Sequence, residues 1–202
     1  MKTPDAGYDV LDKWASPSSN GVTRGVLRRR LHEVPERRFF SAEEYAVLEA
    51  VCARLVPQPD RPEPVLIAPW IDADLQEDKG EGFRHPDMPP IGEAWRRGLA
   101  AIDVEARRRY AQPFAALRFE GVDAILSAVQ AGKAKSFGDL PQQEFFKHML
   151  KFVVGVYYSQ PTAWSEVGLG GPASPRDYVR MGLDERDPRE APLAYAAPDD
   201  GV

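Results

Sequence analysis

The sequence is poor in the residues that cross-link small folds through disulfides or metal ions. It has one cysteine, Cys52, and three histidines among its 202 residues. A single thiol excludes an internal disulfide framework, and it excludes a zinc or iron–sulfur site built from the cysteines of this chain alone. A chain of this length can bury enough apolar surface to fold without such a site. We therefore expect one ordinary soluble domain with a hydrophobic core.

Long hydrophobic runs and excess positive charge are also missing. Lysines and a histidine interrupt the most apolar window, residues 145–158, so no membrane-spanning segment is expected. The formal net charge of −5 argues against a nucleic-acid partner, because phosphate contacts need a basic face. The arginines at 28–30 and 37–38 are not followed by an apolar segment, so we expect no export signal in this chain.

Apolar residues recur at the three- and four-residue spacing of amphipathic helices. This spacing predicts five helices, and no alternating run or hairpin turn indicates a strand. The fold class is therefore all-α, with about five helices in one small domain, a non-globular N-terminal arm and a long irregular C-terminal tail. The helices are expected from 41 to the proline at 57, over 65–76, from 91 to the proline at 113, over 121–130 and over 141–156, with a short helix near 26–32.

Details of two helices can also be predicted. Ser41 and Glu44 have the spacing of a capping box at the start of the first helix, and Cys52 falls on that helix's apolar face. In the third helix, the apolar stripe leaves Glu105 on an outer face with several arginines.

The chain is expected to have three parts. Residues 1–38 form a polar and basic arm, residues 39–158 form the helical domain, and residues 159–202 form a tail rich in proline, glycine and aromatic residues. Such a tail cannot fold on itself, yet it carries more aromatic side chains than a solvated linker. We expect it to wrap a partner protein or the helical body in extended form.

Most patterns that could carry chemistry have a simpler structural interpretation. The acids from Asp72 to Asp78 could form a carboxylate cage, but acids at a helix end usually form a solvated face. The glycine-rich stretch 168–171 lacks the strand and helix of a phosphate-binding loop, so it favours a tight bend that lets the backbone approach a partner closely. His148, on an apolar helix with Glu144 one turn earlier, could serve an enzyme, although a core or boundary histidine is the favoured interpretation.

Several segments, taken in order, resemble the gluconate 2-dehydrogenase subunit 3 family. The resemblance covers about residues 39–180. It rests on FFSAEEY at 39–45, LEAVCARLVP at 48–57, IAPWID at 67–72, WRRGLAAID at 95–103, YAQPF at 110–114, YYSQPTAW at 157–164 and the stretch 168–178.

This resemblance implies a non-catalytic small subunit that binds and stabilises the large FAD-containing subunit of a sugar or alcohol dehydrogenase. The flavin and the active site would then belong to the large flavoprotein subunit, and this chain would hold no cofactor or metal and no catalytic residue. A cytochrome c subunit is a further partner that the resemblance suggests. Many members of the family supply an export signal, which is missing here, so we expect a cytoplasmic complex or a periplasmic one reached by co-export with a partner.

Aromatic and arginine side chains dominate the energetics of protein interfaces. The residues expected to bind the partner are therefore Trp164 and Tyr178, followed by Leu169, Arg176, Tyr157 and Tyr158. The last two could instead complete the core of the fifth helix. The alternative to the subunit hypothesis is a stand-alone helical adaptor that binds an unrelated protein.

Overall fold

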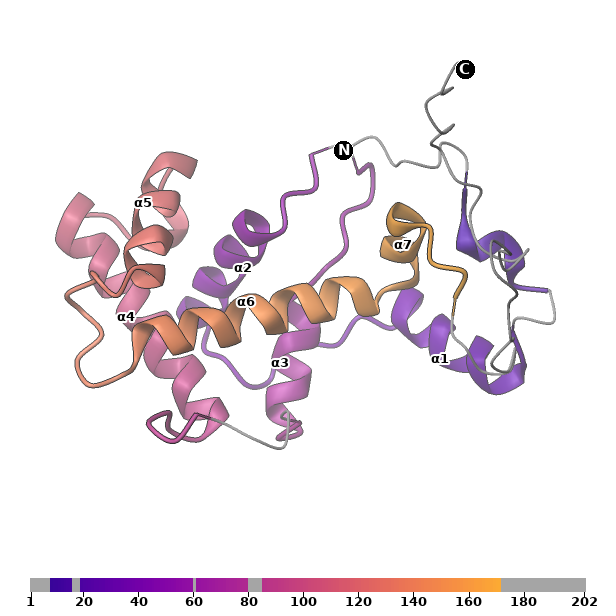
Figure 1. Cartoon of the computed structure of the whole chain (residues 1–202), viewed down its shortest axis with the longest axis horizontal. Helices are drawn as coiled ribbons and strands as arrows, with labels where there is room; N and C mark the ends of the chain where they lie inside the picture. Colours follow the sequence, from indigo (N-terminus) through magenta and orange to yellow (C-terminus); the bar gives the residue numbers. More distant parts are fainter. Residues whose placement is uncertain (1–7, 16–18, 60, 80–84, 172–202) are drawn as a thin grey trace, which may run out of the picture. The chain divides into compact units, whose positions relative to one another are not determined.

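The structure is a computed structural model, and it describes residues 8–15, 19–59, 61–79 and 85–171. These residues form seven α-helices and three short 3-10 helices, with no β-strand among them (Figure 1). The all-α prediction is confirmed, although the helices outnumber the five expected. The described residues belong to two compact units, a larger unit of residues 35–156 and a smaller unit that joins residues 1–34 with 157–202.

The larger unit contains the helices that the sequence periodicity predicted. In it, α2 contacts α3, α4, α5 and the short helix η2, and α4 also contacts α5 and η2. The last three residues of α6 belong to the smaller unit. The elements are α2 (Ala42–Leu55), α3 (Ala68–Gln76), α4 (Ile91–Tyr110), η2 (Phe114–Ala116), α5 (Phe119–Gln130) and α6 (Gln142–Ser159).

The smaller unit brings the N-terminal arm together with the first residues of the predicted tail. In this unit α7 contacts η1, α1 and η3. Its elements are η1 (Val10–Lys13), α1 (Gly21–His32), α7 (Pro161–Trp164) and η3 (Ser165–Val167). The helix expected near 26–32 is therefore a full helix of 12 residues that begins at Gly21.

The centre of the larger unit is the contact between α4 and α6. Trp95 and Phe145 are both fully buried and meet edge to face, with ring centroids 6.1 Å apart. Gly98, one turn after Trp95, has no side chain, and the ring of Phe145 fills the space where a Cβ would lie. Met149 and Val153 continue the buried face of α6. The buried face of α6 is therefore part of the core of the larger unit.

The start of α2 confirms the predicted capping box. The Ser41 side chain accepts a hydrogen bond from the backbone N–H of Glu44 at 3.2 Å, and the Glu44 carboxylate accepts one from the Ser41 N–H at 2.9 Å. Further along the helix, Cys52 is buried as expected. Its burial raises the pKa of the thiol to about 12, so the thiol stays protonated and behaves as a small apolar group.

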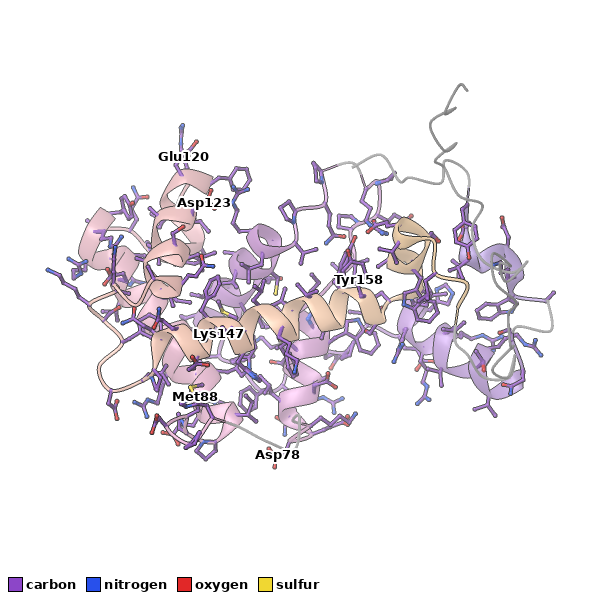
Figure 2. All side chains as sticks on the ribbon, viewed as in Figure 1. Asp78, Met88, Glu120, Asp123, Lys147 and Tyr158 are labelled. Atoms are coloured by element: carbon purple, nitrogen blue, oxygen red, sulfur yellow. The ribbon has the colours of Figure 1, made fainter. Side chains whose placement is uncertain are left out.

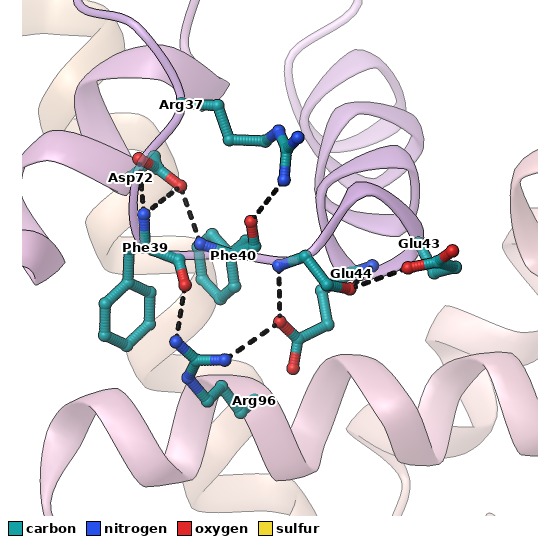
Figure 3. A network of polar contacts seen from close by, with 8 residues as sticks. Arg37, Phe39, Phe40, Glu43, Glu44, Asp72 and Arg96 are labelled. Carbon is teal, nitrogen blue, oxygen red and sulfur yellow. Dashed lines mark hydrogen bonds and ion pairs between the residues drawn. The ribbon is translucent and has the colours of Figure 1, made fainter.

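A buried carboxylate holds the chain just before α2. Asp72, on α3, is fully buried and accepts hydrogen bonds from the backbone N–H groups of Arg38, Phe39 and Phe40 at 2.6–3.1 Å (Figure 3). The expectation that Asp72 lies on a solvated acidic face is therefore wrong. Three convergent backbone donors satisfy this carboxylate and make its burial possible.

Two arginines complete this network around the start of α2. Arg37 donates to the carbonyl oxygen of Phe40 at 2.6 Å. Arg96, on α4, donates to the carbonyl oxygen of Phe39 and to the carboxylate of Glu44, and its guanidinium lies 4.3 Å from the centre of the Phe39 ring (Figure 3). The Arg37–Phe40 stretch is therefore a structural joint between α2, α3 and α4.

A second buried carboxylate corrects the prediction for α4. Glu105 is fully buried rather than on an outer face. It accepts hydrogen bonds from Arg108 and Arg109 at 2.7 Å and from the backbone N–H of Lys135 at 3.2 Å. The hydrogen bond from Arg108 is the main reason that the pKa of Glu105 falls to about 2. These partners keep the carboxylate ionised although it is buried.

An exposed ion pair ties α2 to α5. Arg54 forms a two-pronged contact with the Asp123 carboxylate, and its Nη2 lies 2.6 Å from Oδ2. The same guanidinium lies 5.4 Å from the centre of the exposed Phe119 ring. Figure 2 places Asp123 and Glu120 on α5, at the edge of the larger unit.

Candidate functional site

Four of the six residues predicted to bind a partner lie in the described part of the smaller unit. Tyr157 and Tyr158 lie at the end of α6 (Figure 2 labels Tyr158), Trp164 ends α7, and Leu169 follows η3. Arg176 and Tyr178 lie outside the described residues. The partner-binding role of all six stays a prediction.

Trp164 packs inside this chain. It is only 8% exposed and forms a hydrophobic cluster with Val10 of η1 and Leu27 of α1. Its indole N–H donates a hydrogen bond of 2.6 Å to the carbonyl oxygen of Tyr158. The side chain of Trp164 therefore belongs to the core of the smaller unit. A surface for a partner would have to come from exposed residues near it in the sequence.

The arm residues around Trp164 did not stand out in the sequence. Tyr8, Leu11 and Trp14 pack against the cluster of Val10, Leu27 and Trp164. The only signal was the spacing of Tyr8, Leu11 and Trp14 at intervals of three residues, a pattern too short to distinguish from chance in a segment broken by prolines.

Polar contacts fasten the arm to the segment after α6. The Ser165 hydroxyl accepts a hydrogen bond from the backbone N–H of Val10 at 3.1 Å and donates to the Asp9 carboxylate at 3.3 Å. The Tyr8 hydroxyl donates to the carbonyl oxygen of Leu169 at 2.9 Å. These contacts join residues more than 150 positions apart in the sequence, so the arm forms an integral part of this unit.

The glycines of the predicted bend have two different roles. Gly168 ends η3 with a φ of +64°, a left-handed conformation that a glycine adopts without strain. Gly171 has a φ of +93°, and a Cβ there would lie 3.6 Å from the Val10 side chain. The predicted close approach of the backbone is therefore made, within this chain, to the arm.

Three apolar side chains near Trp164 are exposed to solvent. Tyr158 is 41% exposed, Val167 54% and Leu169 44%. Tyr157, in contrast, is buried, and its hydroxyl donates to the Glu166 carboxylate at 2.6 Å while its ring meets that of Tyr158 edge to face at 5.0 Å. We call Tyr158, Val167 and Leu169 the exposed apolar set, since they are the side chains of this segment that a partner could bury.

The residues considered for catalysis have structural partners. The indole N–H of Trp95 donates a hydrogen bond of 3.3 Å to Nε2 of His148, which matches the favoured boundary interpretation. The carboxylate of Glu144 accepts a hydrogen bond from Lys147 at 2.7 Å, and that bond lowers the Glu144 pKa. Among the described residues, no group of three or more His, Cys, Asp or Glu side chains is placed to hold a metal ion.

In the part of the chain that the structure describes, no helix combines the length and the apolar character needed to cross a bilayer.

Comparison with known proteins identifies the family. The family model described as gluconate 2-dehydrogenase subunit 3 matches residues 42–171, from the start of α2 to the end of the described part of the smaller unit. Searches of curated proteins and of solved structures gave no significant match. A match of 130 residues out of 202 covers well over half of the sequence. The chain therefore belongs to the gluconate 2-dehydrogenase subunit 3 family.

Proposed function

We propose that this chain is the non-catalytic small subunit of a dehydrogenase complex, and that it binds and stabilises the large FAD-containing subunit. The observation that carries the proposal is the family match, which covers nearly all of the larger unit and, in the smaller unit, residues 157–171. The substrate of such a complex would be a hydroxyl group of a sugar, a sugar acid or a related alcohol. A cytochrome c subunit would be a third component, and the complex would work in the cytoplasm or reach the periplasm on a partner's export signal.

The exposed apolar set supports a binding role for the smaller unit. Its three side chains, Tyr158, Val167 and Leu169, lie within six residues of the buried Trp164, on a segment that the arm contacts. Apolar and aromatic side chains on a rigid base favour association, because binding removes them from water without a large loss of conformational entropy.

Stabilisation of the large subunit follows from mass action. A protein that binds only the folded form of its partner stabilises that form, by about 2.7 kcal/mol when it is present at 100 times its dissociation constant. The small subunit needs no chemistry of its own for this effect. In the complex the flavin would carry out the redox step, and this chain would contribute binding surface.

A pull-down from the native cell extract tests the proposal. The tagged chain is expected to retain a larger protein that shows the visible absorbance of oxidised flavin and that reduces a dye when a sugar or alcohol is added. A retained partner without flavin would favour the stand-alone adaptor. A chain that retains no partner at all would refute the subunit proposal.

Paired variants test the exposed apolar set. Tyr158→Ser with Leu169→Ser should reduce the retained flavoprotein, because both changes remove exposed apolar area from the smaller unit. The matched control is Leu66→Ser with Val104→Ser, two similarly exposed residues of the larger unit at 52% and 53%. Equal losses in the two pairs would show that the smaller unit is not the binding surface.

A further inference from the structure

The helix α1 of the smaller unit has an unusual charge. Its 12 residues include four arginines and His32 but no acidic residue, although the chain as a whole has a formal net charge of −5. Among the described residues of the smaller unit, four of the five lysines and arginines lie on this one helix.

Two of the four arginines hold α1 in place. Arg24 donates to the carbonyl oxygen of Ser19 at 2.6 Å, and Arg30 donates to the carbonyl oxygen of Ser159 at 2.7 Å. Between them, Leu27 is buried in the cluster with Trp164. Positions 24, 27 and 30 thus form the inner face of the helix, and their contacts within the smaller unit give each of these three residues a structural role.

The outer face of α1 is exposed and lacks such contacts. We define it as Val22, Gly25, Arg28, Arg29 and His32, which recur at the spacing of one helix face. Val22 is 78% exposed, and the space beside Gly25 is open. Among the described residues, the side chains of Arg28 and Arg29 form no hydrogen bond or ion pair.

Helix stability alone does not explain this face. Cations in the last turn, such as Arg29 and His32, interact favourably with the helix dipole. That effect fades beyond the last turn, and it does not account for an exposed valine and an open glycine in the first half of the same face. These two residues weaken a solvent-exposed helix rather than strengthen it.

The outer face of α1 lies in the same unit as the exposed apolar set. The hydrogen bond from Arg30 reaches Ser159, which directly follows Tyr158, so α1 runs next to the end of α6. Protein interfaces commonly join an apolar centre to a polar rim, and arginine is enriched in them. The smaller unit offers both parts.

We propose that the outer face of α1 docks onto an acidic surface of the large dehydrogenase subunit. This inference rests on the proposed function, and it adds the charge of the partner surface and the residues that recognise it. Acidic side chains are the natural counterpart of unpaired guanidinium groups, which bind carboxylates with two parallel hydrogen bonds. Nucleic acid and anionic membranes carry negative charge over an extended surface, which would also meet the acidic remainder of this chain, whose formal net charge is −5. A protein can confine its acidic groups to a patch that matches this one face, so it is the favoured partner.

Charge reversal on this face provides the test. The double variant Arg28→Glu with Arg29→Glu is used in the full chain, in a pull-down of flavoprotein from the native extract at a series of salt concentrations. At low salt, we expect half-maximal retention of the flavoprotein to need about ten times more of the variant than of the wild-type chain. The difference should shrink at high salt, because ions screen contacts at the rim of an interface.

Two further variants separate a local effect from net charge and from folding. Arg118→Glu with Lys133→Glu makes the same change in net charge on exposed residues of the larger unit, and it should leave retention unchanged. Arg28→Gln with Arg29→Gln removes the charge without introducing repulsion, and it should give an intermediate loss. Far-UV circular dichroism and thermal melts confirm that each variant is folded.

Each outcome decides between the proposals. Flavoprotein retained equally by the wild type and by Arg28→Glu with Arg29→Glu overturns the role of α1 and leaves the subunit function standing. If the wild type retains no flavoprotein, the proposed function fails, and the docking proposal fails with it. Phosphatidylglycerol vesicles and duplex DNA serve as alternative probes. If the wild-type chain binds one of them and the Arg28→Glu with Arg29→Glu variant does not, while both retain the flavoprotein equally, the outer face of α1 binds a membrane or nucleic acid, and the docking proposal is wrong.

Discussion

Gly98 offers a sharp test of how closely α4 and α6 pack. In Gly98→Ala the new methyl group would lie 2.5 Å from Cε1 of Phe145 and closer still to two other ring carbons. The ring has little room to move, since it is fully buried with the ring centroids of Trp95 and Phe137 at 6.1 and 6.0 Å. The substitution must therefore displace a helix or force side chains out of their preferred rotamers.

The expected cost follows from two opposing effects. Overpacking of a dense core costs up to about 3 kcal/mol when neighbouring groups cannot yield. Replacing glycine by alanine within a helix stabilises the helix by about 1 kcal/mol. We therefore expect Gly98→Ala to lower the free energy of unfolding by about 2 kcal/mol, which corresponds to a fall of roughly 4–8 °C in Tm for a chain of this size.

The same substitution at Gly155 is the matched control. Gly155 lies on α6, and a Cβ there would have no other atom within 4 Å. Gly155→Ala should therefore stabilise the chain by about 0.5–1 kcal/mol, the usual effect of removing an exposed helical glycine. Urea unfolding followed by circular dichroism measures both variants. If Gly98→Ala proves as stable as Gly155→Ala, the close contact between α4 and Phe145 is wrong.

Three further predictions concern buried polar groups and the thiol. Asp72→Ala leaves three backbone N–H groups without their acceptor, of which that of Phe40 is buried and those of Arg38 and Phe39 are partly buried, so it should cost about 3 kcal/mol in urea unfolding and speed hydrogen exchange at Phe39 and Phe40. Because the pKa of Glu105 is lowered from 4.5 to about 2, its ionisation stabilises the fold above pH 4.5, and this contribution, on the order of 3 kcal/mol, is lost as the pH falls toward 2. Glu105→Gln should flatten that acid limb of the stability profile, and an unchanged limb would contradict the buried ion pairs. Cys52, whose pKa is raised to about 12, should react with iodoacetamide at pH 8 only after unfolding, so rapid labelling of the folded chain would contradict its burial.

The sequence predicted those features that depend on neighbouring residues. The helices follow from the spacing of their apolar residues, and the capping box at Ser41 and Glu44 joins positions three apart. Gly132, two residues after α5, has the left-handed φ of +71° that glycine adopts at the end of a helix. In each case the information lies within one or two helical turns.

The buried acids could not be predicted in the same way. The donors to Asp72 are backbone groups more than 30 residues away, and backbone N–H groups have no signature in the sequence. Glu105 has arginines three and four positions later, a pattern that also occurs on exposed helices. The third donor to the Glu105 carboxylate is the backbone N–H of Lys135, which lies 30 residues later in the sequence.

Trp164 illustrates the same limit at the candidate site. Its aromatic side chain in a proline- and glycine-rich segment indicated a residue that is buried in a contact. Such a pattern does not reveal whether the residues that bury the side chain belong to a partner or to the same chain. The structure supplies Val10 and Leu27 from the arm as its neighbours. Residue type therefore predicted the need for burial, and only the tertiary contacts identified what covers the side chain.

The family match and the contacts of Trp164 together suggest how the smaller unit is assembled. The match begins at residue 42, so Val10 and Leu27 lie outside it, whereas Trp164 and Leu169 lie inside. A segment within the family's range thus receives part of its core from an arm beyond that range. The same arm carries Arg28 and Arg29 on the outer face of α1. In the proposed complex, one arm therefore has two roles: it contacts the segment that carries the exposed apolar set, and it supplies the positive charge of the docking face.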